Sequence, residues 1–502
     1  MTAFWAIALN TIRMATRRLA AVVTLAVILL GSLFIFSFVE GDNTLIGLLR
    51  VLMTWSFTFM SGLLMLLALY FSSTVLDTEM VERQIYLLDV KPVARWKVLA
   101  GKWTGLAILM GCHVLVMGGL TYGALRWFAR EPRAAAGAAA PVAAVEVAPA
   151  REAAGRVEEE LFTSRRSWQP RLTHADRLAE QLAEDLRRRG RVGDETLASP
   201  AFRASLKALL ERRVPPIAFE SSRAFTFTGL PPPATGSPDL HIRYKLYGRR
   251  GREPELRLSH AWELGHPGAA PVRLTLGSIA GVTREFRASS AAIGPDGTLE
   301  LSLTNLTGPE DDLPAAELLV PAPGGIELLV PSGSFEMNFL RGLVLLWVRI
   351  SMLAAIGIAA NTFLRGRVTA FLLLGLILAG SLSSFVRSVV APETPGIEIF
   401  EGEHAGHDHA GHDPAHAHQL ESEGWGRKLV DAWERKVIPL LFGVLPDFAA
   451  TDPVPDLLVG REIAWSRVAT QALLDVGVRA GLVWLIGLYC FHRKEVGLPV
   501  ID

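Results

Sequence analysis

Cysteine is almost absent from this chain. Among 502 residues only Cys112 and Cys490 are cysteines, and both lie inside apolar runs. They cannot cross-link a domain outside a membrane, so we interpret both as small core residues and expect no disulfide framework.

Motifs for catalysis are also missing. No Gly-x-x-x-x-Gly-Lys-Ser/Thr phosphate loop occurs, and Gly101-Lys102 lacks the upstream glycine, so the chain is not its own ATPase. Neither His-Glu-x-x-His nor Gly-x-Ser-x-Gly is present, which disfavours a hydrolase. The 50 basic and 50 acidic residues balance, so no net charge favours nucleic acid. We expect no enzymatic activity, no directly bound cofactor and no nucleic-acid partner.

Apolar sequence, in contrast, is abundant. Half of the residues are apolar and the mean hydropathy is +0.31, which is typical of a membrane protein. Six stretches have about the 20 residues that a bilayer requires. They are residues 19–39, 49–76, 98–125, 339–364, 368–390 and the weaker 472–491. The first is long and lacks a cleavage pattern, so we expect it to stay as an anchor.

Basic residues predict the orientation of these six spans. They cluster before the first span, between spans two and three, in the turn at Arg365 and Arg367, and after the last span. All four clusters fall on one side, which the positive-inside rule assigns to the cytoplasm together with both termini. Residues 1–18 predict an amphipathic helix in the membrane interface, and an extension of the first span fits the same residues.

The loop at 77–102, between spans two and three, is the most informative segment. It starts acidic, continues with an apolar pair, breaks at a Pro-Val-x-Arg turn and ends in Gly-Lys before the next span. In this order it resembles the ABC-2 type transporter permeases. The resemblance implies that the loop docks on a separate ABC ATPase, through which ATP would act. The coupling residues it implies are Glu79, Glu82, Leu87, Leu88, Pro92 and Arg95.

The same resemblance covers the six-span frame, including the helix at 1–18 and the tail at 460–465. It implies an exporter subunit in the bacterial cytoplasmic (inner) membrane, with a lipid bilayer around it and a second copy or a sister permease beside it. The substrate is not implied. The frame would consist of 19–125, 335–390 and 472–502.

The long insertion outside the membrane departs from the resemblance. Residues 126–215 begin with an alanine-rich linker and continue as a helical region, in which Leu172, Leu178, Leu182 and Leu186 recur at helical spacing. From 216 to 334 apolar and polar residues alternate, which predicts a β-sandwich. The fold class is thus a polytopic α-helical membrane protein with a large extracytoplasmic insertion between helices three and four. His260 and His266 are interpreted as ordinary strand and loop residues.

The extracytoplasmic loop at 391–471 carries a histidine cluster followed by an amphipathic helix. Imidazoles interleaved with carboxylates suit Zn, Ni or Cu, and a physiological metal sensor or sink and a low-complexity linker that binds metal only adventitiously are equal alternatives. The candidate ligands are His404, His407, His409, His412, His416 and His418.

Charges inside the spans are the remaining candidates. Arg349 lies near the middle of span four, where it lines a substrate path, snorkels toward the interface or bonds to carbonyl groups at a helix contact. Asp475 and Arg479 are four residues apart and are expected to pair. An alternative function of another class is a non-transporting scaffold or metal-responsive sensor, with the insertion as its binding domain.

Overall fold

The computed structural model forms two compact units. The helical unit combines the segments before and after the insertion, and the sheet unit lies within the insertion at Arg165–Ser332. The described residues are 3–17, 19–38, 44–81, 93–130, 157–188, 214–231, 239–249, 256–266, 270–309, 315–321, 324–390, 446–449 and 451–493, with six single positions between 199 and 210.

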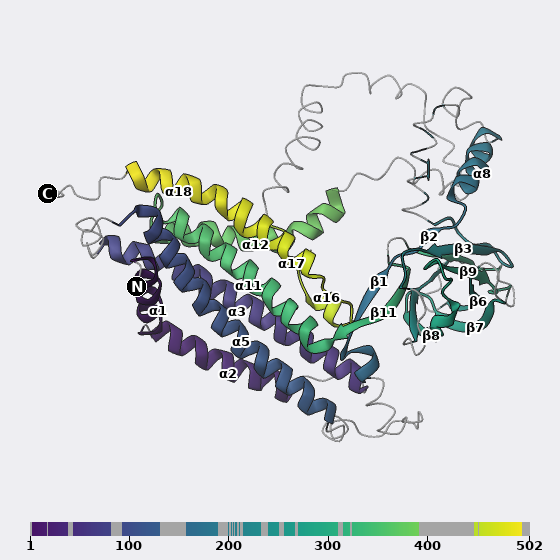
Figure 1. Ribbon diagram of the computed structural model, residues 1–502, viewed down its shortest axis with the longest axis horizontal. Helices are drawn as coiled ribbons and strands as arrows, with labels where there is room; N and C mark the ends of the chain where they lie inside the picture. The colour runs from purple at the N-terminus through teal and green to yellow at the C-terminus, as the bar shows by residue number, and fades with distance from the viewer. Residues whose placement is uncertain are drawn as a thin grey trace, which may run out of the picture. The chain divides into compact units, whose positions relative to one another are not determined.

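The helical unit is built from long apolar helices (Figure 1). They are α1 (Ala3–Arg17), α2 (Leu19–Phe38), α3 (Leu45–Val81), α5 (Arg95–Arg130), α11 (Phe335–Ala360) and α12 (Gly366–Val390). A short α16 (Val454–Leu457) precedes α17 (Trp465–Ala472), the π-helix η4 (Leu473–Ala480) and α18 (Gly481–Arg493), which form one continuous helical stretch.

Among the residues that the structure describes, five helical stretches are long and apolar enough to cross a membrane. They are Leu45–Glu79, Arg95–Arg130, Phe335–Ala360, Gly366–Ser383 and Trp465–Arg493. These confirm a membrane protein with long apolar helices at the second to sixth predicted spans. The first predicted span coincides with the 20-residue α2, but a sixth crossing and the orientation of all spans stay predictions.

Helix α11 forms the core of the helical unit. It packs against α3, α5, α12, η4 and α18, and Figure 1 shows it between α3 and α5 on one side and the last helices on the other. Small residues permit this close packing, as where Gly357 lies against the Ser72 side chain. In the most apolar 18-residue window of α11, 89% is buried inside the protein, whereas the corresponding share in Trp465–Arg493 is 17%.

Helix α1 packs on the first part of α5. Its buried face consists of Ala8, Thr11 and Ala15, while the face with Arg13 and Arg17 is exposed. On α5, Gly105 meets the Ala8 backbone so closely that an added Cβ would lie 2.5 Å from that carbonyl oxygen. The amphipathic pattern therefore produces a helix that docks through small residues, and its place in the membrane interface stays a prediction.

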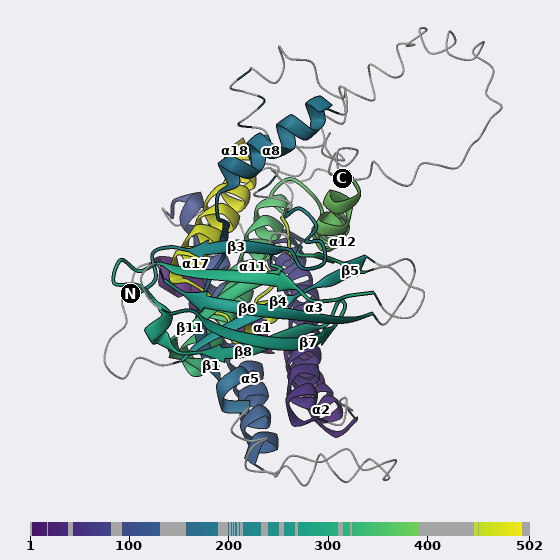
Figure 2. The ribbon, with the colours of Figure 1, turned by 90° about the vertical axis from the view of Figure 1, so that its right-hand side faces the viewer.

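In its described ranges the sheet unit contains eleven strands and the helix α8 (Ala175–Arg188). The strands are β1 (Thr163–Trp168), β2 (Arg171–Leu172), β3 (Ser222–Phe227), β4 (Leu240–Lys245), β5 (Tyr247–Arg249), β6 (Arg257–Gly265), β7 (Val272–Ile279), β8 (Thr283–Ala288), β9 (Leu299–Asn305), β10 (Glu317–Leu319) and β11 (Ile326–Ser334). They form a sheet of order β1-β11-β4-β8, one of order β2-β3-β9-β6-β7 and the pair β10-β5 (Figure 2).

The two larger sheets enclose one apolar core. Tyr244 of β4 and Trp262 of β6 meet across it with ring centroids 5.1 Å apart, and both side chains are buried. Each fully buried aromatic residue contributes about 1.5–3 kcal/mol of transfer free energy. The alternation of apolar and polar residues thus gives a two-layer sheet region.

The strands begin earlier in the chain than the sequence indicates. Both β1 and β2 lie in the stretch predicted as linker and helix, and Leu172 belongs to β2, where it pairs with Phe225. The helical assignment of Leu172 is therefore wrong, and α8 begins only at Ala175. The spacing of Leu172 matched the helical period by coincidence, because a two-residue strand carries no periodic signal of its own.

Candidate functional site

Arg349 is buried at the centre of the helical unit. It is 5% exposed, and its Nη2 donates to the Phe448 carbonyl oxygen at 2.6 Å and to Thr451 Oγ1 at 2.8 Å. Nη1 donates to Ser61 Oγ on α3 at 3.4 Å. Its guanidinium also lies over the Phe448 ring, 5.2 Å from the centroid. All of its hydrogen bonds thus go to neutral oxygen atoms.

Two of these partners belong to the segment that precedes α17. We call this segment, residues 446–449 and 451–464, the fold-back segment. It runs along α11, from the level of Arg349 to that of Asn338, where Asn338 Nδ2 donates to the Arg461 carbonyl and Asn338 Oδ1 accepts the Ile463 amide, both at 2.8 Å. Eleven helical residues separate these two levels, so the segment follows α11 for about 16 Å.

Glycines on two helices provide the space for the fold-back segment. A Cβ on Gly342 of α11 would lie 3.0 Å from Leu457, and one on Gly380 of α12 would lie 2.7 Å from the Phe448 ring. The Phe448 amide also donates to the Gly380 carbonyl at 3.1 Å. Side chains at these two positions would push the segment away.

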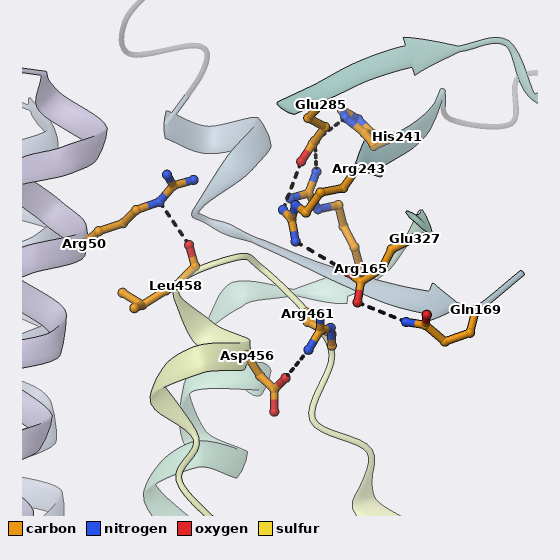
Figure 3. A network of polar contacts seen from close by, with 10 residues as sticks. All are labelled: Arg50, Arg165, Gln169, His241, Arg243, Glu285, Glu327, Asp456, Leu458 and Arg461. Atoms are coloured by element: carbon orange, nitrogen blue, oxygen red, sulfur yellow. Dashed lines mark hydrogen bonds and ion pairs between the residues drawn. The ribbon is translucent and has the colours of Figure 1, made fainter. Parts of the chain in front are cut away.

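Charged side chains hold the same segment at its other end. Arg341 donates to Glu462 at 2.8 Å. Arg50 of α3 donates to the Leu458 carbonyl at 3.1 Å (Figure 3). Within the segment Asp456 accepts from Arg461 at 2.9 Å. Contacts with α3, α11 and α12 therefore hold the fold-back segment in place, largely through hydrogen bonds to its main chain.

The last helix brings a further charge into the bundle. Asp475 is 2% exposed, is bonded by Arg479, and accepts from Gln471 Nε2 at 2.7 Å. The pairing of Asp475 with Arg479 confirms the expectation from their spacing. No sequence pattern predicted the π-helix that carries both residues, a conformation that is rare and often lies at functional sites.

Two of the predicted coupling residues, Glu79 and Arg95, lie at the end of the bundle where α3 ends and α5 begins. Glu79 forms an ion pair with Lys102 at 2.5 Å, and both side chains are buried. Glu79 is thus placed to join α3 to α5, and its part in ATPase coupling stays a prediction.

Arg95 connects the start of α5 to the last helix. Its Nη1 donates to the carbonyl oxygens of Phe491 and His492, the latter at 3.2 Å, and its guanidinium lies over the Phe491 ring. Cations stabilise a helix C-terminus because the last carbonyl groups lack intrahelical donors. Both Glu79 and Arg95 therefore link helices at this end.

The turn between α11 and α12 lies at the same end. Asn361 Nδ2 donates to the Ser73 carbonyl of α3 at 2.9 Å, and Thr362 Oγ1 donates to the Gly487 carbonyl of α18 at 3.0 Å. Asp77 Oδ1 accepts the Gly366 amide at 3.1 Å. Polar contacts thus tie α3, α5, α12 and α18 together around the ends of the loop, a convergence that the sequence did not reveal.

Several predicted site residues lie outside the described part of the chain. These are Glu82, Leu87, Leu88 and Pro92 of the loop and the six histidines between 404 and 418. Over the residues that the structure describes, no group of three or more His, Cys, Asp or Glu side chains is placed to hold a metal ion.

The sheet unit contains a buried cluster of charges on the four-stranded sheet, which Figure 3 shows in detail. Glu285 accepts from Arg165 at 2.5 Å, from His241 Nδ1 at 2.9 Å and from Arg243 at 2.9 Å, and Arg243 lies 3.9 Å from Glu327. The hydrogen bond from His241 and the two guanidinium groups lower the pKa of Glu285 to about 2, against the opposing effect of burial. Two arginines thus share two carboxylates.

His260 lies in the core between the two sheets. It is fully buried, and its ring centroid is 5.2 Å from that of Tyr244. Burial lowers its pKa from 6.5 to about 4. The imidazole is therefore neutral at physiological pH and serves as a core side chain, as the sequence predicted.

No protein-family model, no curated protein and no solved structure matches this chain.

Proposed function

We propose that this chain is the membrane-spanning subunit of an ABC-2 type exporter, working with a separate ABC ATPase and a second permease copy or sister permease in the bacterial cytoplasmic membrane. The resemblance of the loop at 77–102 motivates the proposal. The observation that carries it is the convergence of polar contacts from Glu79, Arg95 and Asn361 on the ends of that loop. A force applied to the loop by an ATPase would reach four helices at once.

In this mechanism the loop residues and Arg95 have different tasks. Glu82 would contact the ATPase, whereas Arg95 passes the displacement to α18 through the Phe491 and His492 carbonyls. Rigid helices held by such contacts move as bodies, which is how a small change at one site alters the packing at another.

The test is co-purification with candidate ATPase subunits from the same genome, followed by ATPase assays in lipid nanodiscs. We expect the native chain to associate and to stimulate hydrolysis. Glu82→Lys should lose the association, whereas Arg95→Glu should keep it and lose most of the stimulation, because its anionic side chain repels the α18 carbonyls.

Lys97→Glu is the matched control for Arg95→Glu. Lys97 is exposed and lies over the Trp96 ring, 5.7 Å from its centroid, so the same change of charge leaves α18 untouched. Both association and stimulation should persist. Failure of the native chain to bind any candidate ATPase would contradict the proposal and favour the scaffold alternative.

A further inference from the structure

Arg349 forms no direct ion pair with the residues that the structure describes. Its hydrogen bonds reach Phe448, Thr451 and Ser61, and its Nε has no acceptor there. A buried guanidinium costs several kcal/mol to desolvate unless a negative charge compensates it. This position therefore suits an anion that these neutral contacts do not supply.

The fold-back segment supplies substitutes for such an anion. In both short hydrogen bonds, Arg349 donates to an oxygen atom of the fold-back segment, at Phe448 and at Thr451. The carboxylates of Asp447 and Asp452, in the same segment, lie close enough to interact electrostatically with the guanidinium. Together they present oxygen atoms and negative charge to Arg349, as a carboxylate or phosphate group would.

Departure of the fold-back segment would change the charge around Arg349. Asp475 stays behind, but Arg479 neutralises it. The remaining groups, Arg349, Arg479 and Asp475, carry one net positive charge, and Arg349 loses its two short hydrogen bonds. Its planar fork of donors would then be open to an oxyanion, the group that guanidinium binds best.

We propose that Arg349 binds an anionic group of the exported substrate, a carboxylate or a phosphate, and that the fold-back segment closes this site by occupying it. The inference rests on the proposed permease function, because only a transporter has an exported substrate. The closed state is the one described, and a transport cycle would exchange the segment for the substrate anion.

The anchors of the fold-back segment near Asn338 allow it to be loosened without touching Arg349. Asn338 bonds two backbone groups of the segment, and Glu462 pairs with Arg341. The double variant Asn338→Ala/Glu462→Gln removes these contacts about three helical turns from Arg349.

The experiment measures how fast a thiol beside Arg349 reacts with charged reagents. Ser61→Cys is introduced in a Cys112→Ser/Cys490→Ser background, which leaves one cysteine, next to Arg349 Nη1. The probes are a sulfonate-bearing methanethiosulfonate and its trimethylammonium analogue. Taking the ratio of the two rates cancels the fraction of thiolate, which is the same for both reagents.

With the intact fold-back segment both rates should be slow. In the loosened double variant both should rise, and the anionic reagent should react faster than the cationic one by about tenfold, because a positive site concentrates anions. Adding Arg349→Gln should bring the ratio near one while the rates stay high, and Arg349→Lys should keep the preference for the anion.

Equal rates for both reagents in the loosened variant would contradict the proposal that Arg349 binds an anion. A preference for the anionic reagent that persists after Arg349→Gln would contradict it as well. Rates that do not rise on loosening would overturn the closing role of the segment. The assay needs no ATPase, so it fails or succeeds independently of the co-purification that tests the permease function.

Discussion

The two units of this protein bury arginine in opposite ways. In the sheet unit Arg165 and Arg243 share the carboxylates of Glu285 and Glu327, so the charges compensate one another inside the fold. In the helical unit Arg349 is bonded only to neutral oxygens, most of them on a segment that is held at a few points. The first arrangement serves the stability of one structure, whereas the second leaves a charge that another partner can use.

The largest expected effect is in the sheet unit. Glu285→Gln leaves Arg165, Arg243 and one remaining carboxylate buried together, and breaking a buried ion pair on one side costs about 3–5 kcal/mol. Hydrogen exchange in the full chain should show a corresponding loss of protection in β4 and β8. The control is Glu300→Gln on the exposed face of β9, where the change should stay within about 0.5 kcal/mol. Equal protection in both variants would show that the cluster is not stabilising.

A second prediction concerns the pH dependence of the same unit. The folded pKa of His260 is about 4 against 6.5 when unfolded, so stability is fully present above pH 6.5. As the pH falls from 6.5 to 4 the unfolded chain binds a proton that the folded chain does not, and about 3 kcal/mol is lost. His260→Phe should remove this loss, as measured by hydrogen exchange in β6 across the same range.

Glu285 acts in a lower pH window. Its folded pKa of about 2 lies below the usual 4.5, so its contribution is present above pH 4.5 and is lost as the pH falls toward 2. A single transition that His260→Phe leaves unchanged would contradict the assignment of the two windows.

The smallest effect is expected at Arg349. Arg349→Met removes donors from the Phe448 carbonyl and Thr451, and unsatisfied neutral acceptors cost about 1–3 kcal/mol. The hydrogen bonds that are lost end on neutral groups, so the loss should be less than that of Glu285→Gln. Hydrogen exchange of the fold-back segment measures it, and Arg349→Lys should retain part of the protection. A loss as large as that of Glu285→Gln would mean that both units use buried arginine for stability alone.

The contrast between α11 and the last helix shows where hydropathy stops being informative. Both stretches are apolar enough to span a membrane, yet most of the apolar window is buried in α11 and little of it in Trp465–Arg493. Hydropathy measures how well a stretch tolerates an apolar environment. It does not distinguish lipid from the side chains of neighbouring helices.

The sequence by itself determined the long apolar helices, the alternating strands and the pairing of Asp475 with Arg479, because each depends on residues a few positions apart. Only the tertiary structure decided that Arg349 holds the fold-back segment, that Glu79 is buried against Lys102 and that Arg95 reaches α18. Arg349 and Phe448, or Arg95 and Phe491, are about 100 and 400 positions apart, and no local period encodes their contact. Such pairs form only when the packed helices bring them together, since a buried charge or an open carbonyl must find a partner within hydrogen-bond distance.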